Sequence, residues 1–214
     1  LIARSWKTND RLNLNKIYKQ VSINQQLIGS LLLGLLWINI DNVFQLIPNN
    51  DIYSTGKYVV LFFGISKLTD MTFGTNSEII AYSKLYRFNF YSTAFLAVST
   101  VISNITLIPI YGINGAALAS LLSLLLYNIT KYLFIWKKFN LHAFNQNTIK
   151  VLGIALFLIF IFYFLPSHHH FIIDLIIKST LFGGSYLILV YYSKSSVEYN
   201  QLIDGILNKI IKRP

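Results

Sequence analysis

The chain has 214 residues, of which 54% are hydrophobic and only 12% are charged, and its mean hydropathy is +0.53. Soluble domains usually carry about 25% charged residues, so this composition excludes one large soluble domain and indicates an all-α, polytopic membrane protein. The formal charge of +10 does not indicate a nucleic-acid partner, because the sequence has no long basic run and no basic patch interleaved with aromatic residues.

The chain begins at Leu1 with a polar, basic stretch that contains RSWKTNDRLNLNKIYKQ and lacks the apolar region of a signal peptide. We therefore expect residues 1–22 to be a cytoplasmic basic segment, and the chain to be a fragment of a longer protein. Residues 11–21 repeat apolar side chains at helical spacing, which predicts a short helix at the membrane surface.

Six segments are predicted to cross the membrane, because each approaches the roughly 20 apolar residues that a helical crossing needs. They are residues 23–47, 57–80, 88–108, 114–136, 149–165 and 171–192. The second is the weakest, since KYVVLFFGIS continues into the polar KLTDMTFGTNSEII. With all six in place, 14 of the 18 lysines and arginines lie on one side, which the positive-inside rule makes cytoplasmic. Both ends of the chain are then cytoplasmic.

The last segment, residues 193–214, is predicted to contain an amphipathic helix. Its apolar residues, among them Tyr199, Leu202, Ile206 and Ile210, recur at i, i+3 and i+4 spacing. A cationic end on such a stripe is typical of a helix that lies on the cytoplasmic membrane surface. Packing against the end of the helix bundle is an equally good interpretation.

Charged residues inside the predicted spans are the candidate functional residues, because a charge near the bilayer centre costs about 3 kcal/mol or more on insertion scales. In the second span, Lys67, Asp70, Gly74, Ser77 and Glu78 fall within an arc of roughly 100° on one helix face. This face cannot contact lipid, so it must face either other helices or water. In the functional interpretation it lines a substrate or ion path. Lys67 and Asp70 can pair there as i, i+3 neighbours.

Asp41, two turns below the outer end of the first span, is a further candidate for this path. An internal structural pair is the competing interpretation for Asp41, Lys67 and Asp70. Glu78 is near the inner end of its span, where solvation alone would explain it.

Three other charged residues are predicted to be structural. Asp174 and Lys178 are i, i+4 neighbours on the last span and are expected to neutralise each other. Lys131 lies within about 9 Å of the cytoplasmic end of its span, so its side chain is expected to reach the membrane surface.

No metal site, cofactor or enzymatic activity is predicted. His168, His169 and His170 adjoin no carboxylate and are expected in a solvated outer loop. The chain has no cysteine, no glycine-rich phosphate loop, no nucleophile elbow and no recognisable pair of catalytic carboxylates.

A run of small residues, GINGAALAS, opens the fourth span just after Pro109. Gly112 and Ala116, and likewise Gly115 and Ala119, are small-xxx-small pairs that let helix backbones approach closely in lipid. The connecting turn is short enough to require an antiparallel hairpin. The third and fourth spans are therefore predicted to be packed neighbours.

The order of these features resembles a known family. The stretches IDNVFQLIPNNDIYSTGKYVV, GTNSEIIAYSKLYRFNFY and NITLIPIYGINGAALASLLS are similar to the C-terminal half of polysaccharide flippases in the multidrug/oligosaccharidyl-lipid/polysaccharide exporter superfamily. The strongest part runs from Leu107 to Ser120. The resemblance implies an exporter of twelve to fourteen helices in two pseudo-symmetric lobes. The chain would supply the last six helices, and an N-terminal lobe of the same protein would complete the cavity.

The resemblance also implies a function. Alternating access would move a polyprenyl-pyrophosphate-linked oligosaccharide, such as an O-antigen unit, from the cytoplasmic to the outer leaflet of the bacterial inner membrane. The implied partners are this lipid-linked oligosaccharide, the membrane lipids and a coupling cation. From the cost of burial we assign Lys67 to the pyrophosphate, and Asp41 or Asp70 to the cation.

Two alternatives stay open at this point. Another exporter of the same superfamily, for a drug or a peptidoglycan precursor, would have a sequence of the same style. A membrane glycosyltransferase or acyltransferase acting on polyprenyl-linked sugars is the alternative from a different class. It is disfavoured because such enzymes place catalytic groups in long loops, whereas the loop between residues 136 and 149 has only His142 as a non-basic titratable group. A purely structural role would not require buried charges.

Overall fold

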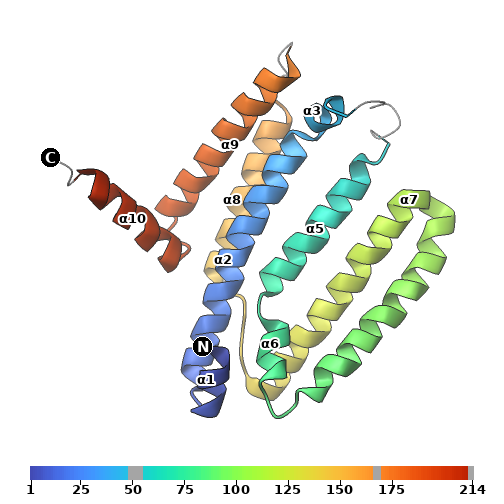
Figure 1. Ribbon diagram of the computed structural model, residues 1–214, viewed down its shortest axis with the longest axis vertical. Helices are drawn as coiled ribbons and strands as arrows, with labels where there is room; N and C mark the ends of the chain where they lie inside the picture. The colour runs from blue at the N-terminus through green and yellow to red at the C-terminus, as the bar shows by residue number, and fades with distance from the viewer. Residues whose placement is uncertain (48–54, 166–169, 212–214) are drawn as a thin grey trace.

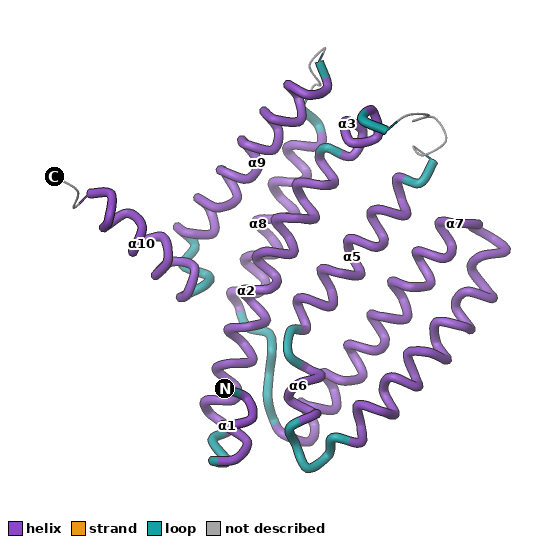
Figure 2. Tube along the Cα trace, in the orientation of Figure 1, coloured by secondary structure: helices purple, strands orange, loops and turns teal. Residues whose placement is uncertain are grey.

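A computed structural model describes residues 1–47, 55–165 and 170–211, and every regular element in these ranges is an α-helix (Figures 1 and 2). The helices are α1 (Ile2–Lys7), α2 (Arg11–Ile38), α3 (Ile40–Gln45), α5 (Lys57–Phe73), α6 (Asn76–Ala81), α7 (Arg87–Phe139), α8 (Gln146–Tyr163), α9 (Phe171–Tyr192) and α10 (Val197–Ile211). The predicted all-α class is confirmed.

Four helices of the described residues, α2, α7, α8 and α9, are long and apolar enough to cross a membrane. The predicted last span, residues 171–192, has the bounds of α9, and the predicted fifth span overlaps α8. The first span lies in α2 and α3, which are separated at Asn39. These helices are compatible with a membrane-embedded protein.

Residues 11–21 are not a separate surface helix, because α2 begins at Arg11 and continues without a break to Ile38. The Asp10 side chain accepts a hydrogen bond from the Asn13 backbone N–H (2.9 Å) and so caps this early start. The segment that follows contains no proline and no glycine before Gly29. Nothing in the local sequence therefore stops the helix at the expected membrane boundary.

The two predicted spans 88–108 and 114–136 both lie in α7, whose backbone reverses direction at Gly112 (φ +56°, ψ −133°). Figure 1 shows the two arms of α7 side by side and antiparallel. Large apolar side chains of the first arm are exposed, including Phe90 (74%), Ile105 (69%) and Ile110 (69%). A lipid environment would cover such a surface.

The long helices stand beside one another, with α5 between α2 and α7 (Figure 1). On its other side α2 packs against α8 and α9. Buried polar contacts tie these helices together: the Tyr186 hydroxyl donates to the Leu27 carbonyl (3.1 Å), and the Gln26 amide donates to the Thr148 carbonyl (3.2 Å). A core around Phe182 fills the space between them.

Three of the basic segments of the sequence, residues 1–22, 81–87 and 137–150, begin or end at one end of the long helices. There α1, α6 and the C-terminal end of α7 lie together, whereas α3 and the bend at Gly112 lie at the opposite end (Figure 1). A second core, which includes Leu14, Tyr18, Ile79 and Phe139, packs at the basic end. This arrangement agrees with the alternation of basic and neutral flanks along the sequence.

The predicted amphipathic helix in residues 193–214 is present as α10. It contacts α9 through Tyr199, whose hydroxyl donates to the Leu187 carbonyl (3.0 Å), and then points away from the other helices (Figure 1). Its apolar residues Leu202, Ile206 and Leu207 are exposed. Asp204, halfway along α10, accepts a hydrogen bond from the Tyr191 hydroxyl of α9 (2.6 Å). The described part of α10 thus contacts the bundle over its first half and leaves an apolar face uncovered.

Candidate functional site

The predicted span 57–80 is not one continuous helix. It is divided at Gly74 into α5 and α6, and α5 alone has 17 residues. Gly74 adopts φ +58° and ψ −121°, a conformation that residues with a side chain rarely take. A Cβ atom at Gly74 would also lie 3.2 Å from the Cα atom of Ser22 in α2. The break is therefore held by both the backbone conformation and the close approach of α2.

This break corrects the expectation of a single polar stripe. Lys67 and Asp70 lie on α5, whereas Ser77 and Glu78 lie on α6. The arc of roughly 100° assumes one continuous helix, so it does not describe residues on both sides of Gly74. The direction of the polar side chains on α5 is therefore independent of the direction of those on α6.

Polar side chains of α2 form hydrogen bonds on both sides of the break. The Ser22 hydroxyl donates a hydrogen bond to the Thr72 carbonyl at the end of α5. The Tyr18 hydroxyl donates to the side-chain oxygen of Asn76 at the start of α6. Because Tyr18 and Asn76 are both buried, this contact fixes α6 against α2.

The network continues from the break into α7. The Asn76 amide donates to the Asn128 carbonyl (3.4 Å), and the Asn128 amide donates to the Asp70 carboxylate (3.2 Å). Asn128 is buried, whereas Asp70 is exposed. A chain of polar contacts thus runs from α2 through both halves of the broken helix to an accessible carboxylate.

Lys131 belongs to the same region, and the prediction that it reaches the membrane surface is wrong. Its side chain is 1% exposed. Its ammonium donates to the Ser77 hydroxyl oxygen (2.8 Å) and to the Tyr127 hydroxyl, and it lies 4.1 Å from the centre of the Tyr127 ring. These local acceptors and the ring face hold the cation between α6 and α7.

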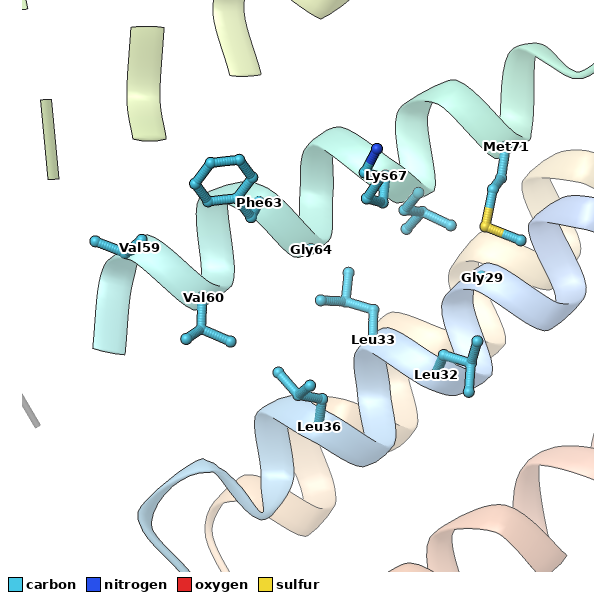
Figure 3. A pocket seen from close by; sticks show the side chains of 11 residues that line it. Gly29, Leu32, Leu33, Leu36, Val59, Val60, Phe63, Gly64, Lys67 and Met71 are labelled. Atoms are coloured by element: carbon cyan, nitrogen blue, oxygen red, sulfur yellow. The ribbon is translucent and has the colours of Figure 1, made fainter. Parts of the chain in front are cut away.

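Lys67 lies at a groove of about 430 Å³ between α2 and α5 (Figure 3). The groove is lined by Gly29, Leu32, Leu33, Leu36, Val59, Val60, Phe63, Gly64, Lys67, Leu68 and Met71. Among the described residues of this lining, Lys67 is the one that is charged, and Figure 3 shows its nitrogen on the side away from Leu33. No ion pair joins the two described residues Lys67 and Asp70. The groove therefore combines an apolar wall with one accessible cation.

Asp41 is placed away from the break. It lies on α3, at the opposite end of the helices from α6 (Figure 1). Its carboxylate oxygens are 2.7 and 2.9 Å from the Lys57 ammonium, and its side chain is 71% exposed. Asp41 thus already has a cationic partner and is not brought together with Lys67 or Asp70.

Glu78 is exposed on α6, where it lines a small surface hollow together with Ile17 and Tyr82. It joins none of the hydrogen bonds that the described residues form around Gly74. Of the four path residues expected from the sequence, only Lys67 and Asp70 therefore share a helix, α5.

The predicted pair of Asp174 and Lys178 is confirmed. The Lys178 ammonium is 2.9 Å from the Asp174 carboxylate, and the two side chains are 8% and 0% exposed. The Asn42 amide on α3 donates to the same carboxylate (2.8 Å). Sequence spacing predicted the pair but not Asn42, because the contact between α3 and α9 joins distant parts of the chain.

The small residues of α7 divide into two roles. A Cβ atom at Gly115 would lie 2.2 Å from the Leu107 carbonyl oxygen, so the arms of the hairpin touch there. Ala119, one turn further along, is fully buried, whereas Ala116 is partly exposed. Gly112 is predicted to belong to a packing pair, but a Cβ atom there would meet no described residue within 4 Å. Its role is the bend, since φ is +56°.

Replacing Gly74 with alanine is expected to destabilise the protein more than replacing Gly112. Both glycines have nearly the same backbone angles, so strain of about 1–3 kcal/mol applies to each variant. Only Gly74→Ala adds a contact with the backbone of Ser22. Thermal unfolding of the purified protein in detergent measures the difference, with Gly153→Ala as the unstrained control. Equal melting temperatures for Gly74→Ala and Gly112→Ala would contradict the proposed contact.

The described residues contain no group of three or more histidine, cysteine, aspartate or glutamate side chains that could hold a metal ion. His168 and His169 lie outside the described residues, and His170 precedes the first residue of α9.

Comparisons with protein-family models, with curated proteins and with solved structures find no match to this chain. The functional assignment therefore depends on the geometry around Gly74 and on the chemistry of the α2–α5 groove.

Proposed function

We propose that the chain acts in a flippase that carries a polyprenyl-pyrophosphate-linked oligosaccharide across the bacterial inner membrane by alternating access. The observation that carries this proposal is the broken helix α5–α6, with its polar network beside an apolar groove that contains Lys67. This geometry supports a path for an amphiphilic, anionic molecule.

The broken helix supports a transport role because transporters place substrate and ion sites at discontinuous membrane helices. Breaking a helix frees backbone polar groups, which are costly in lipid unless protein or water satisfies them. Here the Ser22 hydroxyl satisfies the backbone carbonyl of Thr72 at the end of α5, and the Tyr18 hydroxyl holds the Asn76 side chain at the start of α6. Asp70 remains accessible while it accepts a hydrogen bond from buried Asn128, which makes it our choice for the coupling cation.

The groove supports the choice of substrate class. A polyprenyl chain needs an apolar surface, and its pyrophosphate needs a cation at the edge of that surface. The leucine and valine side chains of α2 and α5 meet the first need, and Lys67 meets the second. Asp41 is a weaker choice for any ion, because Lys57 already neutralises it.

Reversing the charge in Lys67→Glu is expected to reduce transport at least tenfold, because a carboxylate repels the pyrophosphate where an ammonium attracts it. Lys67→Arg is expected to retain most of the activity, since it keeps the charge. The measurement is the translocation of a fluorescent lipid-linked oligosaccharide by the full-length protein in vesicles. Surface polysaccharide in cells is the second readout.

Lys150→Glu is the matched control, because it makes the same charge reversal at an exposed position on α8, outside the groove. Normal transport by Lys67→Glu at normal expression would remove Lys67 from the path. Transfer of sugar by the purified protein would contradict a transporter and favour an enzyme.

A further inference from the structure

A basic cavity of about 870 Å³ is lined by residues of α1, the start of α2, the turn after α6 and the end of α7. Its charged lining residues are all cations, namely Lys7, Arg11, Lys84 and Lys138. They come from three separate parts of the chain, so no basic run in the sequence indicates the cavity. The fold alone brings these four charges together.

The cavity has a rigid wall, because α1 is anchored to the helices beside it. The Trp6 indole N–H donates to the Ile79 carbonyl (3.0 Å), and the Trp6 ring packs edge-on against Phe139 with 4.9 Å between centres. The Asn13 amide donates to the Ser5 hydroxyl oxygen (2.9 Å), which joins α1 to α2. Lys7 and Arg11 are thus presented from a fixed turn.

The four cations are exposed, and none of them forms an ion pair with another residue in the described ranges. Like charges gathered around one cavity repel each other, and a bound anion relieves that repulsion. A concave site with several converging donors favours a phosphate group over a diffuse counterion cloud.

A second hollow of about 530 Å³ adjoins the first and shares Lys84 and Leu85 with it. It adds Arg87 and aromatic side chains, including Phe88 and Phe134, whose rings stack with 3.7 Å between centres. The exposed apolar first arm of α7 begins here. An occupant that uses both hollows is therefore anionic at one end and apolar at the other.

We propose that this cavity binds the phosphate headgroup of an anionic phospholipid, whose acyl chains lie along the start of α7. The aromatic hollow and the apolar arm favour a lipid over a soluble phosphate ester, which would use only the cations. Arg87 stands at the first residue of α7, where the headgroup region of a membrane would meet this helix. The proposal concerns a resident lipid and does not depend on which cargo the protein carries.

The test compares phosphatidylglycerol with phosphatidylcholine of the same acyl chains, bound to the purified full-length protein and counted by native mass spectrometry. Each surface cation is worth about fivefold in affinity for anionic lipid. The double variant Lys84→Gln/Lys138→Gln is therefore expected to weaken phosphatidylglycerol binding on the order of 20-fold. Lys16→Gln/Lys150→Gln is the control, because it removes the same charge from exposed positions outside the cavity.

Equal binding of the two lipids by the unmodified protein would overturn the proposal, as would equal losses in the two double variants. Glycerol phosphate provides the soluble arm of the test. If it displaces phosphatidylglycerol at micromolar concentration, the site recognises the phosphate ester alone and the lipid assignment is wrong. If it competes only weakly while the cavity variant loses lipid, the acyl chains contribute as proposed.

Discussion

Gly115→Ala is expected to destabilise the protein by about 1–3 kcal/mol, although alanine is the better helix former by about 1 kcal/mol. The added methyl group would lie 2.2 Å from the oxygen and 2.6 Å from the carbon of the Leu107 carbonyl. Both are backbone atoms, so no side chain can move aside and the arms of α7 must separate. Chemical or thermal unfolding in detergent measures the loss.

Gly153→Ala on α8 is the matched control for this prediction. It makes the same substitution inside a helix, but within the described part of the chain no atom would lie within 4 Å of its methyl group. This variant is expected to be as stable as the unmodified protein or slightly more stable. If Gly115→Ala behaved like Gly153→Ala, the close contact within the α7 hairpin would be refuted.

Lys178→Met is expected to cost about 3–5 kcal/mol of stability, because it removes an ammonium that lies 2.9 Å from a carboxylate that is 0% exposed. The hydrogen bond from Asn42 remains but does not neutralise the charge. The double variant Asp174→Asn/Lys178→Met is expected to recover most of the loss. Its neutral amide still accepts from Asn42, and no charge stays buried.

The exposed pair of Asp41 and Lys57 supplies the comparison. Lys57→Met leaves a carboxylate that is 71% exposed, so we expect a cost below about 1 kcal/mol. A double-mutant cycle at Asp174 and Lys178, measured by unfolding, tests the contrast. A small effect of Lys178→Met, similar to that of Lys57→Met, would contradict the prediction and show that water reaches the pair of Asp174 and Lys178.

Much of the fold was predictable because its signals are local. Apolar length predicted α8 and α9, and the i, i+4 spacing predicted the ion pair of Asp174 and Lys178. The turn after Pro109 predicted the hairpin of α7. In each case the residues that decide the outcome are neighbours in the chain.

The candidate site was predictable only in part. Lys67 and Asp70 stood out because charges are rare in such a stretch, but they do not form the expected ion pair. Asn128 is a polar residue in an apolar span and could have been singled out on that ground. Tyr18 could not be singled out from the sequence, because it lies in a stretch that is already polar and its partner Asn76 is 58 positions away.

Sequence by itself determined that this protein is all-helical, rich in membrane-compatible helices and basic at one set of helix ends. Composition, periodicity and charge order are sums over neighbouring residues, so no tertiary contact is needed to decide them. Only the tertiary structure decided that Gly74 divides a helix, that Lys131 is buried, and that four cations from three separate parts of the chain share one cavity. These features depend on which helix packs against which. The free-energy cost of burying a side chain, and the partners it finds, are decided by the neighbouring helix and not by the residues next to it in the chain.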